Sequence, residues 1–367
     1  MKFIHMADMH FDAPFTNLSD KENFGNIRRM DQRAVFKKLI DYIKNNNINY
    51  LFISGDLYEH QYIRETTIEY INNLFKEIPA TKIFISPGNH DPYINNSMYK
   101  NFNWNNNVII FNSNVKKYSY EDADIYGYGF TDFYSENSII NELKIENQNK
   151  INILVMHANL DQVGEKKYNE VKTKELEELG FNYIALGHIH KSNYEKISET
   201  SNNTKAINNI IYPGSTVAIG FDEQGEHGVI EGEFNNKELT LKFIPLDDKK
   251  FIVINLDVTD IISKEELIEK INNLDLIENN YYEIVFTGRR NFEIDKNEIN
   301  KFIIKNNIIK LKDNTKINID INKLINENSL KGLFVKELFE KINNEQNEEN
   351  KKILENALEI GLNVLDK

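Results

Sequence analysis

The chain has 367 residues, of which 40% are hydrophobic and 28% charged, a composition that is ordinary for a globular protein with room for two domains. The sequence contains no cysteine, which excludes disulfides, thiolate catalysis and cysteine-type zinc sites, so a metal ion would have to be held by His, Asp, Glu or Asn. A formal net charge of −13 argues against a free-standing nucleic-acid-binding protein, and no apolar run approaches the about 18 residues of a membrane-spanning helix, so we expect a cytoplasmic location.

The first part of the chain alternates two kinds of pattern. Apolar runs of strand length occur at 1–7, 50–54, 82–86, 151–156 and 183–186, and apolar residues at helical spacing occur at 26–44 and 63–75. This alternation predicts a mainly buried α/β sheet. The Asn-rich stretches 141–150 and 195–209 are predicted to be polar loops or insertions.

Each of the five predicted strands ends in side chains that can bind metal ions. These are Asp8 and His10, Asp56, Asn89 within the sequence Gly-Asn-His-Asp, His157, and His188 with His190. In an open α/β sheet the ligand-binding crevice lies beyond the carboxyl ends of the strands, so we expect these side chains to converge. A single histidine is more often a core or surface residue than a ligand, but five successive strand ends of this kind are hard to obtain by accident.

The residue types in this set indicate the chemistry. Carboxylate, amide and imidazole ligands, with one carboxylate able to bridge, suit two divalent ions such as manganese, iron or zinc. Two ions roughly 3.5–4 Å apart would clamp a phosphoryl group and convert a bound water into the attacking hydroxide. The sequence therefore predicts hydrolysis of a phosphate ester.

Five motifs carry a resemblance to a known family: Asp8-x-His10, Gly55-Asp56, Gly88-Asn89-His90-Asp91, His157 and Gly187-His188-x-His190. In this order they resemble the calcineurin-like metallophosphoesterase superfamily, whose α/β core has sheets packed between helices. The resemblance implies that one ion is held by Asp8, His10, Asp56 and His190, and the other by Asp56, Asn89, His157 and His188, with Asp56 as the bridge. It also implies that His90 assists the leaving group without binding metal, and that Asp91 orients His90.

Finer features resemble the SbcD/YhaO-type DNA repair exonucleases within that superfamily. They are the segments Ile4–Phe15, Ser54–Tyr58, Tyr212–Thr216 and Phe221–Glu223. This resemblance implies a manganese-dependent DNA exonuclease or endonuclease, with Fe²⁺ or Zn²⁺ as alternative metals, that works with an SbcC-like coiled-coil ATPase; it leaves a homodimer open. Glu59-His60 does not align with the histidine that some relatives carry after the bridging aspartate, so we assign His60 no role.

The pattern predicts three parts: a catalytic domain at 1–247, a small α+β capping module at 251–325 and C-terminal helices at 328–367. The module would help to position DNA, or would be a solvated packing domain without ligand contact. The candidate phosphate contacts are Arg28, Arg29, Arg33, Arg289 and Arg290.

The last part is predicted to form two amphipathic helices. Apolar residues recur at Leu330, Phe334, Leu338 and Ile342, and again at Leu354, Leu358 and Leu362. Such helices either pack on their own domain or bind the partner ATPase, foremost through Phe334, Leu338 and Phe339. In the second case the partner could supply much of the nucleic-acid affinity that this acidic chain lacks.

Two other functions compete with the DNA nuclease. A small-molecule or nucleotide phosphodiesterase or phosphatase on the same scaffold would suit the acidic charge, but would leave the module and the helices with little to do. A non-catalytic scaffold is disfavoured because the ligand set is intact.

Overall fold

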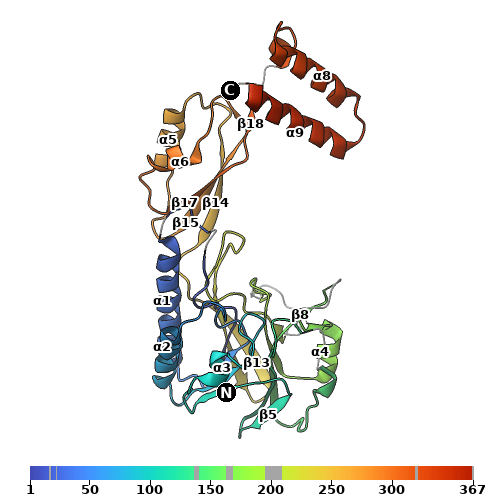
Figure 1. Cartoon of the computed structure of the whole chain (residues 1–367). Coiled ribbons are helices and arrows are strands. Elements are labelled where there is room, and N and C mark those ends of the chain that lie inside the picture. Colours follow the sequence, from blue (N-terminus) through green and yellow to red (C-terminus); the bar gives the residue numbers. More distant parts are fainter. Residues whose placement is uncertain are drawn as a thin grey trace, which may run out of the picture. The chain divides into compact units, whose positions relative to one another are not determined.

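The computed structural model describes residues 1–15, 18–21, 23–135, 140–162, 168–194, 209–318 and 321–365. Most of the predicted insertion at 195–209 lies outside these residues. The chain divides into two compact units, Met1–Ile252 and Val253–Lys367, whose elements are labelled in Figure 1. Among the described helices, none combines the length and the apolar character needed to cross a bilayer.

Two sheets form the centre of the first unit. The first has the order β13-β12-β1-β2-β3-β4. Its strands are β1 (Lys2–Met6), β2 (Tyr50–Ile53), β3 (Lys82–Ile85), β4 (Val108–Ile110), β12 (Gly228–Asn235) and β13 (Glu238–Pro245). Strands β1 to β4 run parallel, whereas β12 pairs antiparallel with both β1 and β13.

The second sheet has the order β11-β10-β7-β6-β5. Its strands are β5 (Lys116–Ser119), β6 (Ala123–Gly127), β7 (Ile151–His157), β10 (Tyr183–Gly187) and β11 (Ile210–Ile211). All are parallel except β5, which is antiparallel to β6. The five predicted strands are therefore present, but they are divided between two sheets rather than joined in one.

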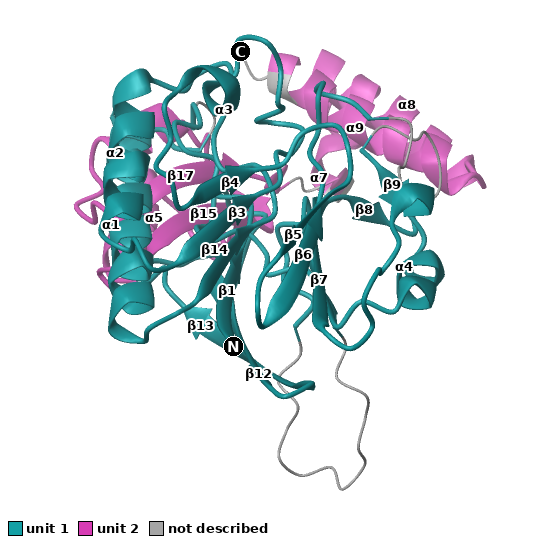
Figure 2. Cartoon of the chain, turned by 90° about the horizontal axis from the view of Figure 1, so that it is seen from below, with its two compact units in different colours: residues 1–252 teal, residues 253–367 magenta. Residues whose placement is uncertain are grey.

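Alternate side chains of the strands supply three apolar layers. Leu51 and Ile53 of β2 pack with helices α1 (Phe24–Asn45) and α2 (Glu65–Lys76), while Tyr50 and Phe52 face the other way into an aromatic-rich core between the sheets. The far face of the second sheet packs around Leu176 of α4 (Thr173–Leu179). Figure 2 shows α1 and α2 outside the first sheet and α4 outside the second. This helix–sheet–sheet–helix order confirms the predicted fold class.

Short elements complete the first unit. They are α3 (Met98–Asn101), a single 3₁₀ turn at Ile140–Glu142, β8 (Asn159–Leu160) and β9 (Glu170–Val171). Strands β8 and β9 pair in parallel directly after the ligand strand β7.

The second unit begins with a small α+β arrangement. Strands β14 (Phe251–Asp257), β15 (Tyr281–Thr287) and β17 (Ile308–Asp313) form one sheet, and β16 (Arg289–Arg290) pairs with β18 (Lys316–Ile317). Helices α5 (Lys264–Asn272) and α6 (Lys296–Asn300) connect the strands. The Ser263 hydroxyl accepts a hydrogen bond from the Glu266 amide, which caps α5 where the sequence pattern predicts a helix.

The C-terminal helices form a hairpin. After α7 (Ile321–Leu324), helices α8 (Leu330–Asn344) and α9 (Glu348–Leu365) pack together around Val335, Ile342, Leu358 and Leu362. Gly361 allows this approach, because a Cβ at that position would lie 2.1 Å from the Phe334 ring. Phe334 and Leu338 also pack on this cluster, so much of the predicted apolar stripe is used within the hairpin.

The candidate phosphate contacts differ from the prediction at Arg28. Its side chain is fully buried and donates hydrogen bonds to the Ala218 carbonyl oxygen and the Asp247 carboxylate, so it is not accessible to a phosphate. Arg29 and Arg33 are partly exposed, and Arg33 is paired with Asp12 at 3.1 Å. Arg289 is exposed, whereas Arg290 donates to Thr315.

Candidate metal centre

The strand ends of both sheets meet at one place. Asp8 and His10 follow β1, Asp56 follows β2 and Asn89 follows β3, while His157 ends β7 and His188 and His190 follow β10. Three groups of side chains there place their ligand atoms within 4.8 Å of one another: Asp8, His10 and His190; His10, Asp56 and His90; and Asp56, His157 and His188. The structure thus brings together every side chain that the sequence singled out as a ligand.

The backbone at this centre is held in uncommon conformations. Four of the predicted ligands have positive φ angles: Asp8 at 51°, His10 at 49°, Asp56 at 51° and His188 at 106°. Residues other than glycine seldom adopt such angles, and each costs on the order of 1–3 kcal/mol, so the surrounding structure must enforce them. Gly88 fits the same constraint, because a Cβ there would lie 2.3 Å from the Asp56 Oδ1 atom.

On one side of the centre, two imidazoles face each other. The Nε2 atoms of His10 and His190 are 3.1 Å apart. Their Nδ1 atoms lie 2.7 Å from Glu59 and 2.6 Å from Glu223, respectively. Because an Nδ1–H that donates to a carboxylate leaves Nε2 with its lone pair, two lone pairs point at each other, and a cation between them resolves the conflict.

The other side of the centre shows the same feature. The His157 Nδ1 atom donates to the Ser54 carbonyl oxygen at 2.8 Å, which leaves the Nε2 lone pair 3.4 Å from the Asp56 Oδ2 atom. The Asn89 Oδ1 atom lies 3.0 Å from His157 Nε2 and 3.2 Å from His188 Nδ1. These buried acceptors face acceptors, so the donor set fits divalent cations.

The charges of the protein groups alone favour a cation. Burial opposes ionisation of Asp56, but the positive imidazoles of His157, His10 and His90 outweigh it and lower the Asp56 pKa to about 2. Burial, reinforced by His157, lowers the pKa of His188 to about 4, so this imidazole is neutral and free to bind metal. For Asp8, burial dominates and raises the pKa.

His90 lies beside these ligands and is more open to solvent. Its side chain is 44% exposed, and its Nδ1 atom is 3.0 Å from the Glu59 Oε2 atom. Burial disfavours the imidazolium, but the hydrogen bond to Glu59 and the charges of Asp56 and Glu59 outweigh this effect and raise the His90 pKa to about 9. His90 is therefore a proton donor at neutral pH.

The carboxylate that contacts His90 is Glu59 and not Asp91. The Asp91 carboxylate is fully buried and accepts hydrogen bonds from the backbone amides of Asp56, Leu57 and Gly88 and from the Tyr99 hydroxyl. These contacts tie the loop after β2 to the loop after β3. Sequence reasoning missed Glu59, although it lies only three residues after Asp56, and each of its oxygens contacts one histidine of the centre.

A second carboxylate missed as a site residue is Glu223. One of its oxygens contacts His190, and the other accepts hydrogen bonds from the Ser215 hydroxyl at 2.7 Å and the Ile219 amide at 3.1 Å. The Pro-Gly-Ser and Phe-Asp-Glu segments noted in the sequence therefore meet behind His190. They fix the imidazole from the side opposite the centre.

A buried polar chain supports His157 in a similar way. Ser54, whose carbonyl oxygen accepts from His157, uses its hydroxyl to donate to the Ala185 carbonyl oxygen. The His5 Nε2 atom lies 3.0 Å from this hydroxyl oxygen, and its Nδ1 atom lies 2.9 Å from the Tyr183 hydroxyl. Since burial lowers the His5 pKa to about 3, a neutral imidazole links the two sheets at the centre.

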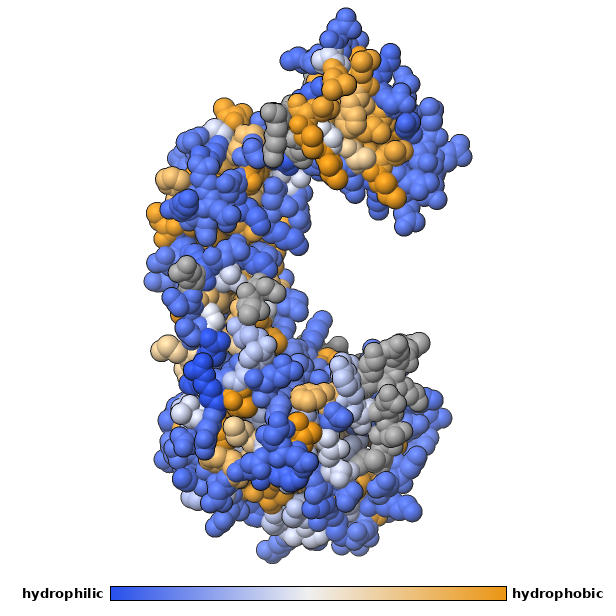
Figure 3. Space-filling view, viewed as in Figure 1, coloured by the Kyte–Doolittle hydropathy of each residue, from blue (hydrophilic) through white to orange (hydrophobic). Residues whose placement is uncertain are grey.

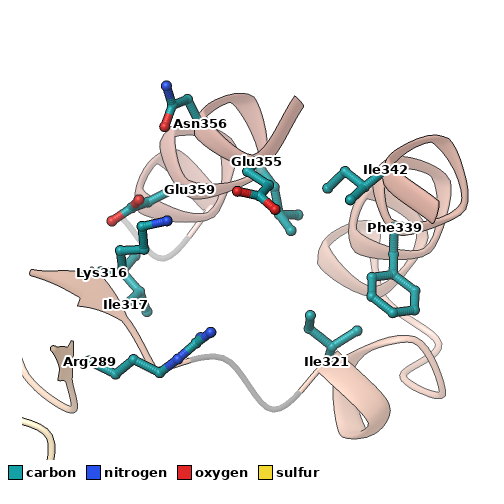
Figure 4. Close-up of a pocket in the computed structure, with 10 residues that line it drawn as sticks. Arg289, Lys316, Ile317, Ile321, Phe339, Ile342, Glu355, Asn356 and Glu359 are labelled. Atoms are coloured by element: carbon teal, nitrogen blue, oxygen red, sulfur yellow. The ribbon is translucent and has the colours of Figure 1, made fainter. Parts of the chain in front are cut away.

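A cavity lies apart from this centre, within the second unit. Figure 4 shows it between strands β16 and β18 and helices α7 to α9, with an apolar floor that includes Ile321, Phe339 and Ile342. Arg289 and Lys316 line one side, and Glu355 and Glu359 another. Among the described residues, the groups able to hold a metal ion all lie in the first unit.

Two facing sheets whose strand ends gather histidines and carboxylates define a metal-dependent hydrolase of phosphoester bonds. The sequence model of the calcineurin-like phosphoesterase family matches residues 1–192, and the chain belongs to that family.

Curated relatives are similar over larger parts of the chain. The uncharacterized metallophosphoesterase YhaO of Bacillus subtilis is 24% identical over 71% of this chain and 64% of its own length. A component of the nuclease SbcCD of Staphylococcus saprophyticus is 27% identical over 67% of this chain and 69% of its own, and the DNA double-strand break repair protein Mre11 of Methanococcus maripaludis is 26% identical over 54% of each. The chain thus matches between about half and about two thirds of these relatives.

Proposed function

We propose that this protein is a DNA nuclease of DNA repair that hydrolyses phosphodiester bonds with two divalent metal ions, manganese first and iron or zinc as alternatives. The observation that carries the proposal is the pair of histidine Nε2 atoms, from His10 and His190, that face each other at 3.1 Å beside the buried carboxylate of Asp56. The names of the SbcCD nuclease and of the DNA repair protein Mre11 support DNA as the substrate. A DNA substrate would place the protein in the cytoplasm.

In this proposal the ligands divide into two sets. Asp8, His10, Asp56 and His190 hold one ion and Asp56, Asn89, His157 and His188 hold the other. Bound there, the ions would neutralise charge on the phosphoryl oxygens and lower the pKa of a nearby water. Glu59 and Glu223 keep the Nε2 atoms of His10 and His190 directed into the centre. His90 donates its proton to the departing oxygen.

A small-molecule phosphodiesterase is the second candidate, because the net charge of −13 opposes DNA binding by this chain alone. Purified protein with manganese should be compared on linear duplex DNA, bis-p-nitrophenyl phosphate and nucleotide diesters. We expect cleavage of DNA, and anomalous scattering from two ions bridged by Asp56. Hydrolysis of the small diesters without any cleavage of DNA would favour the second candidate. A single ion with Asn89 and His188 turned away would contradict the ligand assignment.

We also propose that residues 251–325 act as a module that positions DNA and that residues 328–367 bind a coiled-coil ATPase. Apolar side chains remain exposed on the hairpin after α8 and α9 have packed together; they are Leu330, Leu333, Ile353, Ile360 and Val364. Figure 3 shows apolar residues gathered on this hairpin. Because Phe334 and Leu338 pack inside it, the exposed set is better placed to meet a partner.

A double substitution tests the hairpin. Leu333→Glu with Ile360→Glu should abolish association with the ATPase in size-exclusion chromatography, because both side chains are about two-thirds exposed, at 67% and 64%, and contribute little to the fold. Manganese-dependent hydrolysis of a small diester should stay at the wild-type level. Truncation after Asn328 should have the same two effects. If the truncated protein is instead insoluble, or melts many degrees lower, the hairpin belongs to the core of the second unit.

A further inference from the structure

Aromatic rings line one side of the metal centre. The Phe130 ring packs edge-on against His157 at 5.6 Å, and the Tyr168 ring lies 5.0 Å from His188 with an interplanar angle of 36°. The Tyr134 ring follows Tyr168 at 5.9 Å and 37°. A row of rings therefore leads from a predicted metal ligand out to Tyr134.

The backbone holds this row in place. Ser135 and Tyr168 form a parallel bridge, and the Asn169 amide donates to the Ser135 carbonyl oxygen at 2.9 Å. The Asn169 side chain is fully buried and donates to the His157 carbonyl oxygen at 2.9 Å. The two tyrosines are thereby fixed to the same strand end that delivers His157 to the centre.

The outer ring of the row is open to solvent. Tyr134 is 59% exposed, while Tyr168 is partly buried between it and His188. Neither catalysis nor packing of the sheets uses the exposed ring, since Tyr134 belongs to none of the three apolar layers of the first unit. An exposed aromatic face beside a phosphodiester site is suited to stacking of a nucleobase, because every base offers a π-face.

We propose that Tyr134 and Tyr168 form a stacking platform for the base of a nucleotide that flanks the scissile phosphate. The proposal rests on the proposed function and narrows its substrate class to phosphodiesters that carry a base. Because the Tyr168 ring lies 5.0 Å from the His188 ring, a base on this platform would be one nucleotide away from a phosphate at the centre.

A cycle that changes both protein and substrate tests the platform. Wild type, Tyr134→Ala and Tyr134→Phe are compared on short single-stranded oligonucleotides that are either complete or carry one tetrahydrofuran abasic residue on the 5′ or the 3′ side of the scissile phosphate. With manganese, Tyr134→Ala should lower kcat/KM by about tenfold or more on the complete substrate and leave it unchanged on one of the two abasic substrates. Tyr134→Phe keeps the ring and should resemble wild type on all three.

Equal losses for Tyr134→Ala on all three substrates would show a structural role and overturn the proposal, as would no loss on any of them. Binding of the same fluorescently labelled oligonucleotides, measured by anisotropy, gives a readout that does not depend on turnover. If no oligonucleotide is hydrolysed, the proposed function fails. The platform then stands only if the anisotropy still shows tighter binding of the complete substrate that is lost in Tyr134→Ala.

Discussion

Replacing Asp56 by asparagine should remove metal from both sides of the centre and lower turnover by at least about a thousandfold. Asp56 shares one group of candidate ligands with His10 and another with His157 and His188. Its carboxylate is buried and ionised, with a pKa of about 2. Asparagine keeps the shape but removes the charge. Loss of the several kcal/mol that metal ions supply in phosphoryl hydrolysis corresponds to roughly three powers of ten in rate.

The measurement is metal content by mass spectrometry together with manganese-dependent hydrolysis of DNA and of a small diester. Asp124→Asn is a matched control, because Asp124 is also a buried aspartate of the first unit, but it pairs with Lys150 at 3.2 Å instead of facing the centre. The control should keep both ions. Wild-type metal content in Asp56→Asn would show that this carboxylate does not bridge.

The strand ends can be predicted from the sequence because a buried parallel strand is a short apolar run with a sharp end. The residues that follow such runs, Asp8, Asp56 and Asn89, stand out without knowledge of the strand pairing. The division into two sheets cannot be predicted in this way. In β2, for example, Tyr50 and Phe52 face the second sheet while Leu51 and Ile53 face helices, and both faces are apolar. A run that is apolar on both faces does not show which layer covers it.

The residues behind the ligands are less predictable. Glu59 and Glu223 are carboxylates in a chain with 57 acidic residues, and only the fold brings them within 2.7 Å of a histidine. Arg28 shows the opposite case, since an arginine is expected at the surface and this one is buried. It lies four residues after Phe24 and four before Gln32, and all three are on the buried face of α1. This spacing could have placed it inside.

Substitution of His90 by alanine should lower kcat on DNA by about 10²–10⁴-fold while metal content stays near wild type. The imidazole is 44% exposed, and Glu59 raises its pKa to about 9 after the opposing effect of burial, so it carries a proton at neutral pH. His60→Ala is the matched control. His60 is the next histidine along the chain, and no partner is seen for its buried Nδ1 atom among the described residues. We expect it to retain activity.

The leaving group distinguishes proton donation from a structural role of His90. A p-nitrophenolate ion departs without a proton, whereas the sugar oxygen of DNA needs one, so His90→Ala should lose much more activity on DNA than on bis-p-nitrophenyl phosphate. Glu59→Gln should differ from it by also weakening metal binding, because Glu59 contacts both His90 and the predicted ligand His10. Equal losses on both substrates, or loss of an ion from His90→Ala, would mean that His90 holds the centre together and does not act as the acid.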